Sequence, residues 1–131
     1  MALKVSRAVI EGMLTEAQRS APSECCGILL GGASDIESYR PADNVHPEPA
    51  THFEIDPRAL ILALREEREG GARVAGYYHS HPTGRGEPSA TDRSSASGDG
   101  RIWAIVASGD VSFWRDEPDG FTMLSYTPSD G

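Results

Sequence analysis

Two segments of the chain show the apolar spacing of a helix that packs one face against a core. The first follows Ser6, a residue type favoured at helix N-caps, and is expected to end near Ser20. Its apolar positions recur every three or four residues, at Val9, Ile10, Met13, Leu14 and Ala17. A helix over this segment buries that row of side chains and leaves the polar ones in water.

The second helical segment begins at Asp56-Pro57. Aspartate suits the N-cap and proline the first helical position, so the pair predicts a helix start. Residues 65–69 are expected to face solvent, and Gly70-Gly71 to end the helix. The side chains expected to face the core are Leu60, Ile61 and Leu64.

Short apolar or alternating runs between Gly, Pro, Asp and Ser residues predict the strands. They cover residues 24–31, 36–40, 52–55, 73–78, 101–107, 111–115 and 121–126. Gly109-Asp110 and Pro118-Asp119-Gly120 mark turns between the last three. A loop is expected over residues 80–88, and a short third helix from Ser89 to near Gly98. This pattern predicts a mixed α/β fold with a largely antiparallel sheet.

The composition fits one compact domain spanning residues 1–131, with 38% hydrophobic and 24% charged residues. Twelve Lys and Arg against 20 Asp and Glu give a net charge of −8, which disfavours nucleic-acid binding because the phosphate backbone is also negative. No apolar run approaches the ~20 residues that span a bilayer. Adjacent Cys25 and Cys26 suggest two unbridged thiols in a reducing compartment. We therefore expect a cytoplasmic protein with no membrane or nucleic-acid partner.

The chemistry of the chain is concentrated in His79-Ser80-His81-Pro82 and Ser89-Ala90-Thr91-Asp92. Histidines two apart at the end of a strand point to the same side, as a chelate requires. Asp92 follows in the first turn of the expected third helix, where its carboxylate can reach back to the strand end. Two imidazoles and one carboxylate leave a tetrahedral Zn²⁺ one open position, which is typical of catalytic sites.

Simpler interpretations stay open at this point. The two histidines can be loop residues, and Ser89 with Asp92 can serve only to cap a helix. His46 and His52 lack a partner at ligand spacing and are expected to be loop and surface residues.

Metal-assisted hydrolysis also needs a group that moves protons. A carboxylate near the metal that does not coordinate it can take a proton from water and later deliver one to the leaving amine. Glu24, at the start of an otherwise apolar strand, is the best candidate. A solvated strand-entry role for Glu24 stays open, as do the other carboxylates Glu54, Asp56 and Glu87.

Three motifs follow one another across nearly the whole chain: Glu24 before Cys-Cys-Gly-Ile-Leu-Leu-Gly, then His79-x-His81-Pro82, then Ser89-x-x-Asp92. In these motifs the sequence resembles the JAMM (MPN+) metalloprotease family. The resemblance implies one zinc ion held by His79, His81 and Asp92, with Glu24 as general acid/base and Ser89 as a hydrogen-bond donor to the developing oxyanion. It also implies a cytidine-deaminase-like α/β fold with a mixed, largely antiparallel sheet between helices.

The resemblance further implies hydrolysis of the peptide or isopeptide bond after the C-terminal Gly-Gly of a ubiquitin-like protein. The loops around residues 65–73 and 94–100 are short and lack the insertions with which eukaryotic members clamp ubiquitin chains. The chain is therefore similar to the small stand-alone bacterial members that release cysteine, or another amine, from a ubiquitin-like sulfur-carrier protein. The expected partner is such a carrier with a Gly-Gly tail, and the oligomeric state, a homodimer included, stays open.

Three rival functions are weighed against this one. A deubiquitinase-like isopeptidase acting on ubiquitin-like conjugates would use the same site. A non-catalytic MPN scaffold would have lost the ligands, whereas all five site residues are present in this sequence. A zinc nucleoside deaminase would need a Pro-Cys-x-x-Cys motif, which the sequence lacks.

Overall fold

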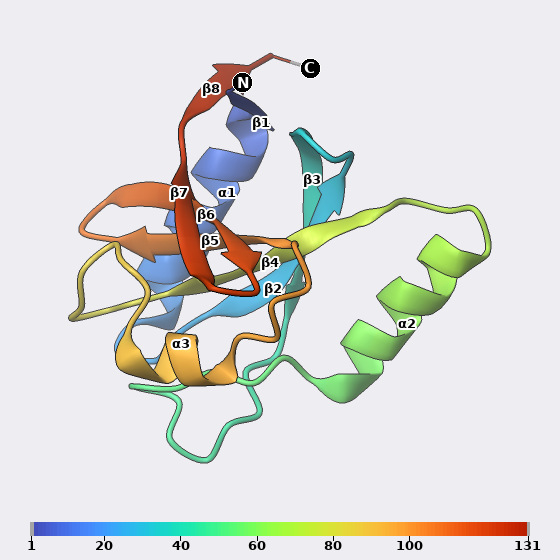
Figure 1. Cartoon of the computed structure of the whole chain (residues 1–131). Coiled ribbons are helices and arrows are strands. Elements are labelled where there is room, and N and C mark those ends of the chain that lie inside the picture. Colours follow the sequence, from blue (N-terminus) through green and yellow to red (C-terminus); the bar gives the residue numbers. More distant parts are fainter. Residues whose placement is uncertain (1, 131) are drawn as a thin grey trace.

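An eight-stranded sheet forms the centre of the molecule. In the computed structural model, which describes residues 2–130, the strand order is β7-β6-β5-β4-β2-β3-β1-β8 (Figure 1). The strands are β1 Leu3–Ser6, β2 Cys26–Gly31, β3 Asp35–Ala42, β4 Val74–Ser80, β5 Ile102–Ala107, β6 Asp110–Glu117, β7 Gly120–Leu124 and β8 Tyr126–Ser129. The helices are α1 Arg7–Ser20, α2 Pro57–Arg68 and α3 Ala90–Ser95.

The sheet is mixed, as predicted. β3, β2 and β4 pair antiparallel, and so do β5, β6 and β7, whereas β4 runs parallel to β5, and β1 runs parallel to β3 and β8. Ser108 and Gly109 connect β5 to β6 with positive φ angles of 54° and 76°, which suits the twist of a two-residue hairpin. The predicted turn at 118–120 connects β6 to β7.

The sheet curls back on itself. β7 and β8 are the two edges of the strand order, yet only Ser125 separates them in the sequence. The amide of Leu3 on β1 donates to the carbonyl of Ser125 at 3.0 Å. Phe113 on β6 and Tyr126 on β8 contact edge to face across this closure, with ring centroids 4.8 Å apart. The two ends of the sheet therefore approach each other.

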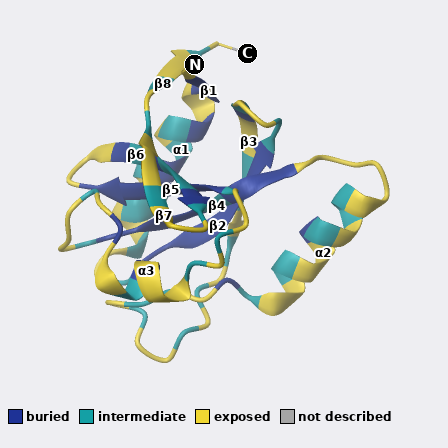
Figure 2. Cartoon of the chain, in the orientation of Figure 1, coloured by how far each residue is buried: buried dark blue, intermediate teal, exposed yellow. Residues whose placement is uncertain are grey.

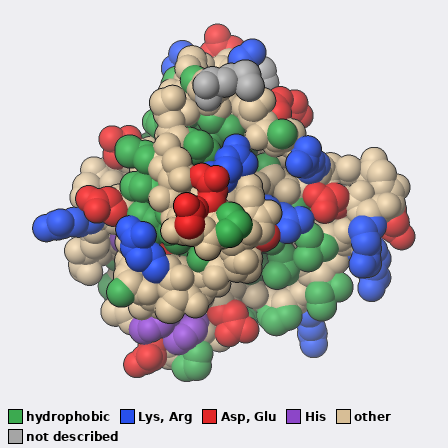
Figure 3. All heavy atoms as spheres, viewed as in Figure 1, with side chains coloured by type: hydrophobic (Ala, Val, Ile, Leu, Met, Phe, Trp, Pro, Cys, Tyr) green, Lys and Arg blue, Asp and Glu red, His purple; other side chains and the backbone are tan. Residues whose placement is uncertain are grey.

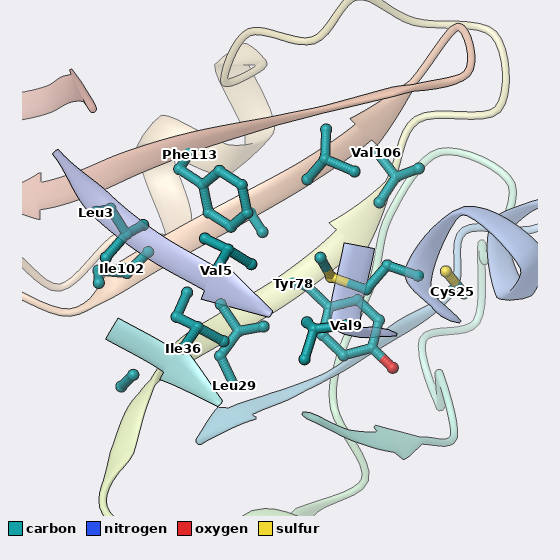
Figure 4. Packing of buried hydrophobic residues seen from close by; sticks show 14 residues of the cluster. Leu3, Val5, Val9, Cys25, Leu29, Ile36, Tyr78, Ile102, Val106 and Phe113 are labelled. Atoms are coloured by element: carbon teal, nitrogen blue, oxygen red, sulfur yellow. The ribbon is translucent and has the colours of Figure 1, made fainter. Parts of the chain in front are cut away.

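The helices cover opposite faces of the sheet. Val9 and Met13 of α1 pack into the main core with side chains from six strands, among them Val5, Tyr78 and Phe113 (Figure 4). On the other face, Ala63 of α2 packs against a smaller cluster: Ile28, Leu30 and Val74. Successive side chains of a strand point to opposite faces of the sheet, which explains why there are two clusters. On β2, Leu29 lies in the main core, whereas its neighbours Ile28 and Leu30 lie in the smaller cluster. The central strands are accordingly buried on both faces (Figure 2).

The predicted strand over residues 52–55 is wrong. Only Ile55 makes a bridge, with Asn44, and the rest of the segment belongs to a loop folded around the Asn44 side chain. β1 and β8 were not predicted, because each has four residues and depends on pairing with a distant segment. The single strand predicted over residues 121–126 is interrupted at Ser125. Before this residue the chain pairs with β6 as β7, and after it the chain pairs with β1 as β8.

The exposed face of α2 also differs from the prediction. Ile61 is 56% exposed, whereas Ala63 is 1% exposed and provides the buried contact. Glu66 and Glu67 are not fully solvated, because Glu66 pairs with Arg40 at 3.0 Å and Glu67 accepts a hydrogen bond from the amide of Val74 at 2.7 Å. Residues 65–69 are therefore not all turned to solvent as the sequence had predicted, because Glu66 and Glu67 are partly buried.

Two helix ends also differ from expectation. Ser6 occupies the N-cap of α1 as predicted, but its side chain makes no capping hydrogen bond. α3 ends at Ser95 and not near Gly98, because the amides of Ser97 and Gly98 donate to the buried Asp116 carboxylate at 3.1 Å each. This carboxylate replaces the helical acceptors that the two amides would otherwise use.

The surface carries both signs of charge. On the face shown in Figure 3, Lys and Arg side chains lie scattered among Asp and Glu. Within residues 2–130, none of the helices has the length and apolar character needed to cross a membrane.

Candidate metal centre and active-site cleft

His79, His81 and Asp92 meet at the end of β4. His79 is the second-last residue of the strand and His81 follows its end, so both imidazoles lie on the same side. The Nε2 atoms of the two histidines are 3.0 Å apart. The Asp92 carboxylate completes the triangle, with Oδ1 3.0 Å from His79 Nε2 and Oδ2 3.1 Å from His81 Nε2. These atoms form a group that is able to hold a metal ion.

Asp92 is held in place by the start of α3. Ser89 and Asp92 form a reciprocal capping box: the Asp92 amide donates to Ser89 Oγ at 3.0 Å, and the Ser89 amide donates to Asp92 Oδ2 at 2.9 Å. The predicted helix cap is thus present. It orients the Asp92 carboxylate toward the histidines, so the capping role and a role at the site coexist.

The hydrogen-bond chemistry of this triangle favours a bound cation. His81 Nδ1 lies 2.6 Å from the carbonyl oxygen of Arg85, which can only accept, so Nδ1 carries the proton. In neutral His81, Nε2 therefore carries a lone pair and no proton. This lone pair faces the imidazole of His79 and a carboxylate oxygen of Asp92. Three electron-pair donors converging in this way fit a positive ion between them, and the Arg85 carbonyl sets the required tautomer.

The electrostatics of the three groups keep Asp92 ionised. Burial lowers the pKa of His79, against the opposing effect of Asp92. For His81, burial acts to lower the pKa, but the hydrogen bonds to Asp92 and to the Arg85 carbonyl outweigh it and raise the value. Burial likewise opposes the ionisation of Asp92, but hydrogen bonds from both histidines hold its pKa well below the usual range. The site therefore keeps a carboxylate charge in a buried position.

Glu24 lies beside this group because of strand register. β2 and β4 pair antiparallel with Cys26 opposite His79, and the Ser80 amide donates to the Cys25 carbonyl at 3.1 Å. Continuing this register places Glu24 opposite His81. Glu24 is 7% exposed, and burial, together with the charge of Asp92, raises its pKa to about 7 against the opposing effect of His81. A carboxyl group with that pKa can both accept and release a proton near neutral pH.

The site opens into a cleft of about 360 Å³. Glu24, His81 and Ser89 line it, and His79 and Asp92 lie buried directly behind His81. The segment 43–56 and helix α3, which flank the cleft, lie at the same end of the sheet (Figure 1). The structure therefore brings all five predicted site residues together around one opening. Of the three other carboxylates that the sequence left open for proton transfer, Glu87 lines the same cleft, whereas Glu54 and Asp56 are not among its lining residues.

Sequence reasoning missed the aromatic support of His79. Phe53 stacks on the His79 imidazole, with ring centroids 4.2 Å apart and an interplanar angle of 15°. Trp103 lies nearly perpendicular to both rings, with its ring centroid 5.7 Å from that of His79 and 5.9 Å from that of Phe53. The sequence predicted only a strand over residues 52–55, and the contact of Phe53 with His79 is set by the tertiary structure.

Ser80, expected at the beginning of a loop, is the second missed residue. Its hydroxyl oxygen accepts a hydrogen bond from the Cys25 amide at 2.8 Å, deep in the protein. This bond ties the end of β4 to the segment that carries Glu24. A serine between the two histidines was the only local signal for this role.

The two cysteines and the other two histidines singled out in the sequence pack against neighbouring parts of the structure. Cys25 and Cys26 are buried and unbridged, as expected, and burial raises the pKa of their thiols to about 11 and about 12. These thiols are therefore protonated and poorly nucleophilic at neutral pH. His46 and His52 stack on each other with centroids 4.6 Å apart, in the loop next to the cleft.

Comparison with known proteins identifies the family. Residues 6–117 match the family described as prokaryotic homologs of the JAB domain. The chain is 36% identical to the desampylase of Haloferax volcanii, over 74% of each protein. It is 38% identical to a "Probable TtuB-protein conjugate cleaving protease" of Thermus thermophilus, over 70% of this chain and 62% of that protein. It is 26% identical to the CysO-cysteine peptidase of Mycobacterium tuberculosis, over 94% of this chain and 80% of that protein.

Solved structures agree with this assignment. A protein of Desulfitobacterium hafniense superposes with a TM-score of 0.84 at 26% identity, over 98% of this chain and 94% of that one. A JAB1/MPN domain protein of Archaeoglobus fulgidus has the same fold, with a TM-score of 0.61 at 19% identity over 96% and 97% of the two chains. The expected JAMM/MPN fold is confirmed. With His79, His81 and Asp92 arranged so that they are able to hold a metal ion, and with a family match over most of its length, the chain belongs to the prokaryotic JAB-domain family and is a JAMM-type hydrolase.

Proposed function

We propose that this protein is a zinc-dependent isopeptidase that cleaves the amide bond after the C-terminal Gly-Gly of a ubiquitin-like or sulfur-carrier protein. The observation that carries the proposal is the triangle of His79, His81 and Asp92 next to a cleft lined by Glu24. The names of the relatives support the substrate class, since they are a desampylase, a protease of TtuB-protein conjugates and a CysO-cysteine peptidase.

His79, His81 and Asp92 would hold the zinc ion. Two neutral imidazoles and one carboxylate are a ligand set that zinc favours over calcium or magnesium, which prefer oxygen ligands alone. When bound in a site with three protein ligands, zinc polarises the scissile carbonyl and lowers the pKa of a water molecule. The tautomer of His81 already directs its Nε2 lone pair toward this position.

Glu24 would move the protons. Its carboxylate would accept a proton from the attacking water and then donate it to the departing amine nitrogen, so that one side chain serves both halves of the reaction. Its position opposite His81 and its pKa of about 7 suit it to both steps. Glu24 is not a member of the metal-binding group, so it remains free to exchange a proton.

Ser89 would stabilise the developing negative charge on the substrate carbonyl oxygen. Its Oγ accepts from the Asp92 amide, which leaves the hydroxyl proton free to donate into the cleft. A hydrogen bond that strengthens as charge develops lowers the barrier more than one that is equally strong in the ground state.

Part of the cleft wall suits an extended substrate with small side chains. Ala50 and Thr51 line one part of it, and Thr83 and Gly84 line another. Small side chains on these walls suit a Gly-Gly tail, which carries no side chains and can extend along the backbone. The short connections from α2 to β4 and from α3 to β5 favour a small carrier–amine adduct over a polyubiquitin chain as substrate.

The test is a comparison of substrates with the purified, zinc-loaded protein. A carrier–cysteine adduct, an isopeptide-linked carrier conjugate and lysine-linked di-ubiquitin would be incubated separately, and cleavage would be followed by mass spectrometry. We expect cleavage after Gly-Gly of at least one carrier substrate, slower cleavage of di-ubiquitin, and turnover by Glu24→Gln that is lower by about 10²–10⁴-fold. Zinc-loaded wild type that leaves all three intact, or a Glu24→Gln variant as fast as wild type, contradicts the proposal.

A further inference from the structure

The side chain of Asn44, in the loop 43–56 beside Glu24, uses all of its hydrogen-bonding groups. Its Nδ2 donates to the carbonyl oxygens of Glu24 and His52, at 3.0 Å each. Its Oδ1 accepts from the amides of His46 at 3.1 Å and Glu54 at 3.0 Å. An amide has two donors and two acceptor sites, so every one is occupied. We propose that Asn44 is a positioning residue that fixes the main chain of Glu24 at the mouth of the metal site.

Glu24 lies beyond the end of the strand, and the loop around Asn44 holds its main chain. β2 begins at Cys26, so Glu24 lies outside the strand. The amide of Glu24 donates to the carbonyl of Pro49 at 2.7 Å, and its carbonyl accepts from Asn44. Both main-chain groups of Glu24 are thus bound by the loop 43–56, one directly and one through the Asn44 side chain.

The same loop contributes two further parts of the site. It carries Phe53, which stacks on His79, and it supplies Ala50 and Thr51 to the cleft wall. Its main ordered pairing is the bridge between Asn44 and Ile55, flanked by bonds from the Val45 amide to the Glu54 carbonyl and from the Asp56 amide to the Asp43 carbonyl. The loop therefore depends on the Asn44 side chain for the bonds that a longer strand pair would otherwise make.

Only asparagine among residues of this size satisfies these four partners. An aspartate would place an acceptor-only oxygen against the carbonyls of Glu24 and His52, and an alanine would leave all four groups without this partner. Because the Glu24 carboxylate must reach the reacting atoms, a main-chain shift of about 1 Å is enough to lower turnover by up to about 100-fold. This inference rests on the proposed function, since it assigns Asn44 its effect through the proton-transfer role of Glu24.

The experiment compares Asn44→Asp and Asn44→Ala with a matched control, His46→Ala. The control removes another side-chain hydrogen bond of the same loop, from the Glu48 amide to His46 Nδ1 at 2.9 Å, without touching Glu24. Amide hydrogen exchange at Glu24, zinc content, kcat and KM would be measured for each variant, alone and combined with Glu24→Gln. The alanine variant serves if the aspartate variant does not fold.

We expect the Asn44 variants to retain zinc, to exchange the Glu24 amide at least about tenfold faster than the control, and to lose about 10- to 100-fold in kcat with little change in KM. In the Glu24→Gln background the same substitution should cost less than about threefold, because the group it positions is already gone. Unchanged exchange at the Glu24 amide, or an equal loss of kcat in both backgrounds, overturns the inference. If the wild-type protein cleaves no carrier substrate, the proposed function is refuted but the inference about Asn44 is not. The exchange rate of the Glu24 amide then still decides whether Asn44 holds the main chain of Glu24.

Discussion

The ring of Phe53 lies face to face on the imidazole of His79, with centroids 4.2 Å apart. His79 is fully buried, and Trp103 stands perpendicular to it on another side, at an interplanar angle of 89°. Aromatic packing therefore sets the plane of a ring whose Nε2 points at His81 and Asp92. A loop residue controls the orientation of a strand residue more than 20 positions away in the sequence.

Phe53→Leu should weaken metal binding without removing any ligand. Loss of the flat contact allows the His79 ring to rotate, and disturbed support around a metal ligand typically costs about 10- to 100-fold in affinity. Competition with a chromophoric chelator measures the change. Phe121→Leu is the matched control, because Phe121 contacts Trp103 at 5.0 Å without stacking on His79. Equal affinities for the two variants would show that the stacking does not orient His79.

His79→Ala and His81→Ala should each lose the metal. With only two ligands left, the site no longer encloses the ion, so the expected zinc content falls from about one per chain to nearly none. Elemental analysis after gel filtration measures it. His46→Ala, a histidine outside the triad, should keep the wild-type content. A chelator should also lower the melting temperature of wild type, since bound metal stabilises only the folded protein.

Glu24→Gln should separate metal binding from chemistry. The glutamine keeps the size of the side chain but cannot transfer a proton, so turnover should fall by about 10²–10⁴-fold while zinc content stays near wild type. Steady-state kinetics and metal analysis on the same preparation provide the comparison. If the variant loses zinc, Glu24 is a ligand and the assignment of roles is wrong.

Ser89 should show two separable roles. Ser89→Ala removes the cap on Asp92 and should cost about 1 kcal/mol of stability. Ser89→Asp can still cap but presents a negative charge to the oxyanion, so it should keep the melting temperature and lose about 10²-fold in kcat. Thermal unfolding and kinetics of both variants test this. A Ser89→Asp variant with normal melting temperature and near wild-type kcat would mark Ser89 as a helix cap alone.

Glu16→Gln should stabilise the protein increasingly as the pH rises. Burial raises the pKa of Glu16 above 4.5, against the opposing effect of the Tyr78 hydroxyl, which donates to it at 2.6 Å. The folded state therefore favours the protonated acid. Its contribution to stability is complete below the unfolded pKa near 4.5 and is lost as the pH rises through the folded value. Glutamine accepts the same hydrogen bond without ionising.

The measurement is the difference in melting temperature between Glu16→Gln and wild type across pH 4 to 8. The difference should grow in favour of the variant above about pH 4.5 and then level off. Thr15→Ser, on the exposed side of the same helix, is the control and should show a constant difference. A difference that shrinks with rising pH would mean that the charged form of Glu16 is the stabilising one.

Local signals in the sequence determined much of this protein. The apolar spacing of α1, the Asp56-Pro57 start of α2 and the Ser89 cap all depend on residues a few positions apart, as does the β5–β6 turn, which was predicted at 109–110 and lies at 108–109. The same holds for His79 and His81, whose spacing on a strand end places both rings on one side. Residue chemistry and position made Asp92 and Glu24 candidates, and the resemblance to the JAMM family then implied their roles.

The tertiary structure alone decided which distant groups meet. The register of β2 and β4 brings the chain before Cys26 next to His81, and the loop 43–56 then holds Glu24 there. A one-residue slip of this register would turn each side chain to the other face. The stacking of Phe53 on His79, the four bonds of Asn44 and the pairing of β1 with β8 each join segments that share no local pattern. Side-chain periodicity reports which face of an element is apolar, but it does not report which element covers that face. That choice depends on the free energy of packing the whole sheet, which is why these contacts appear only in the folded molecule.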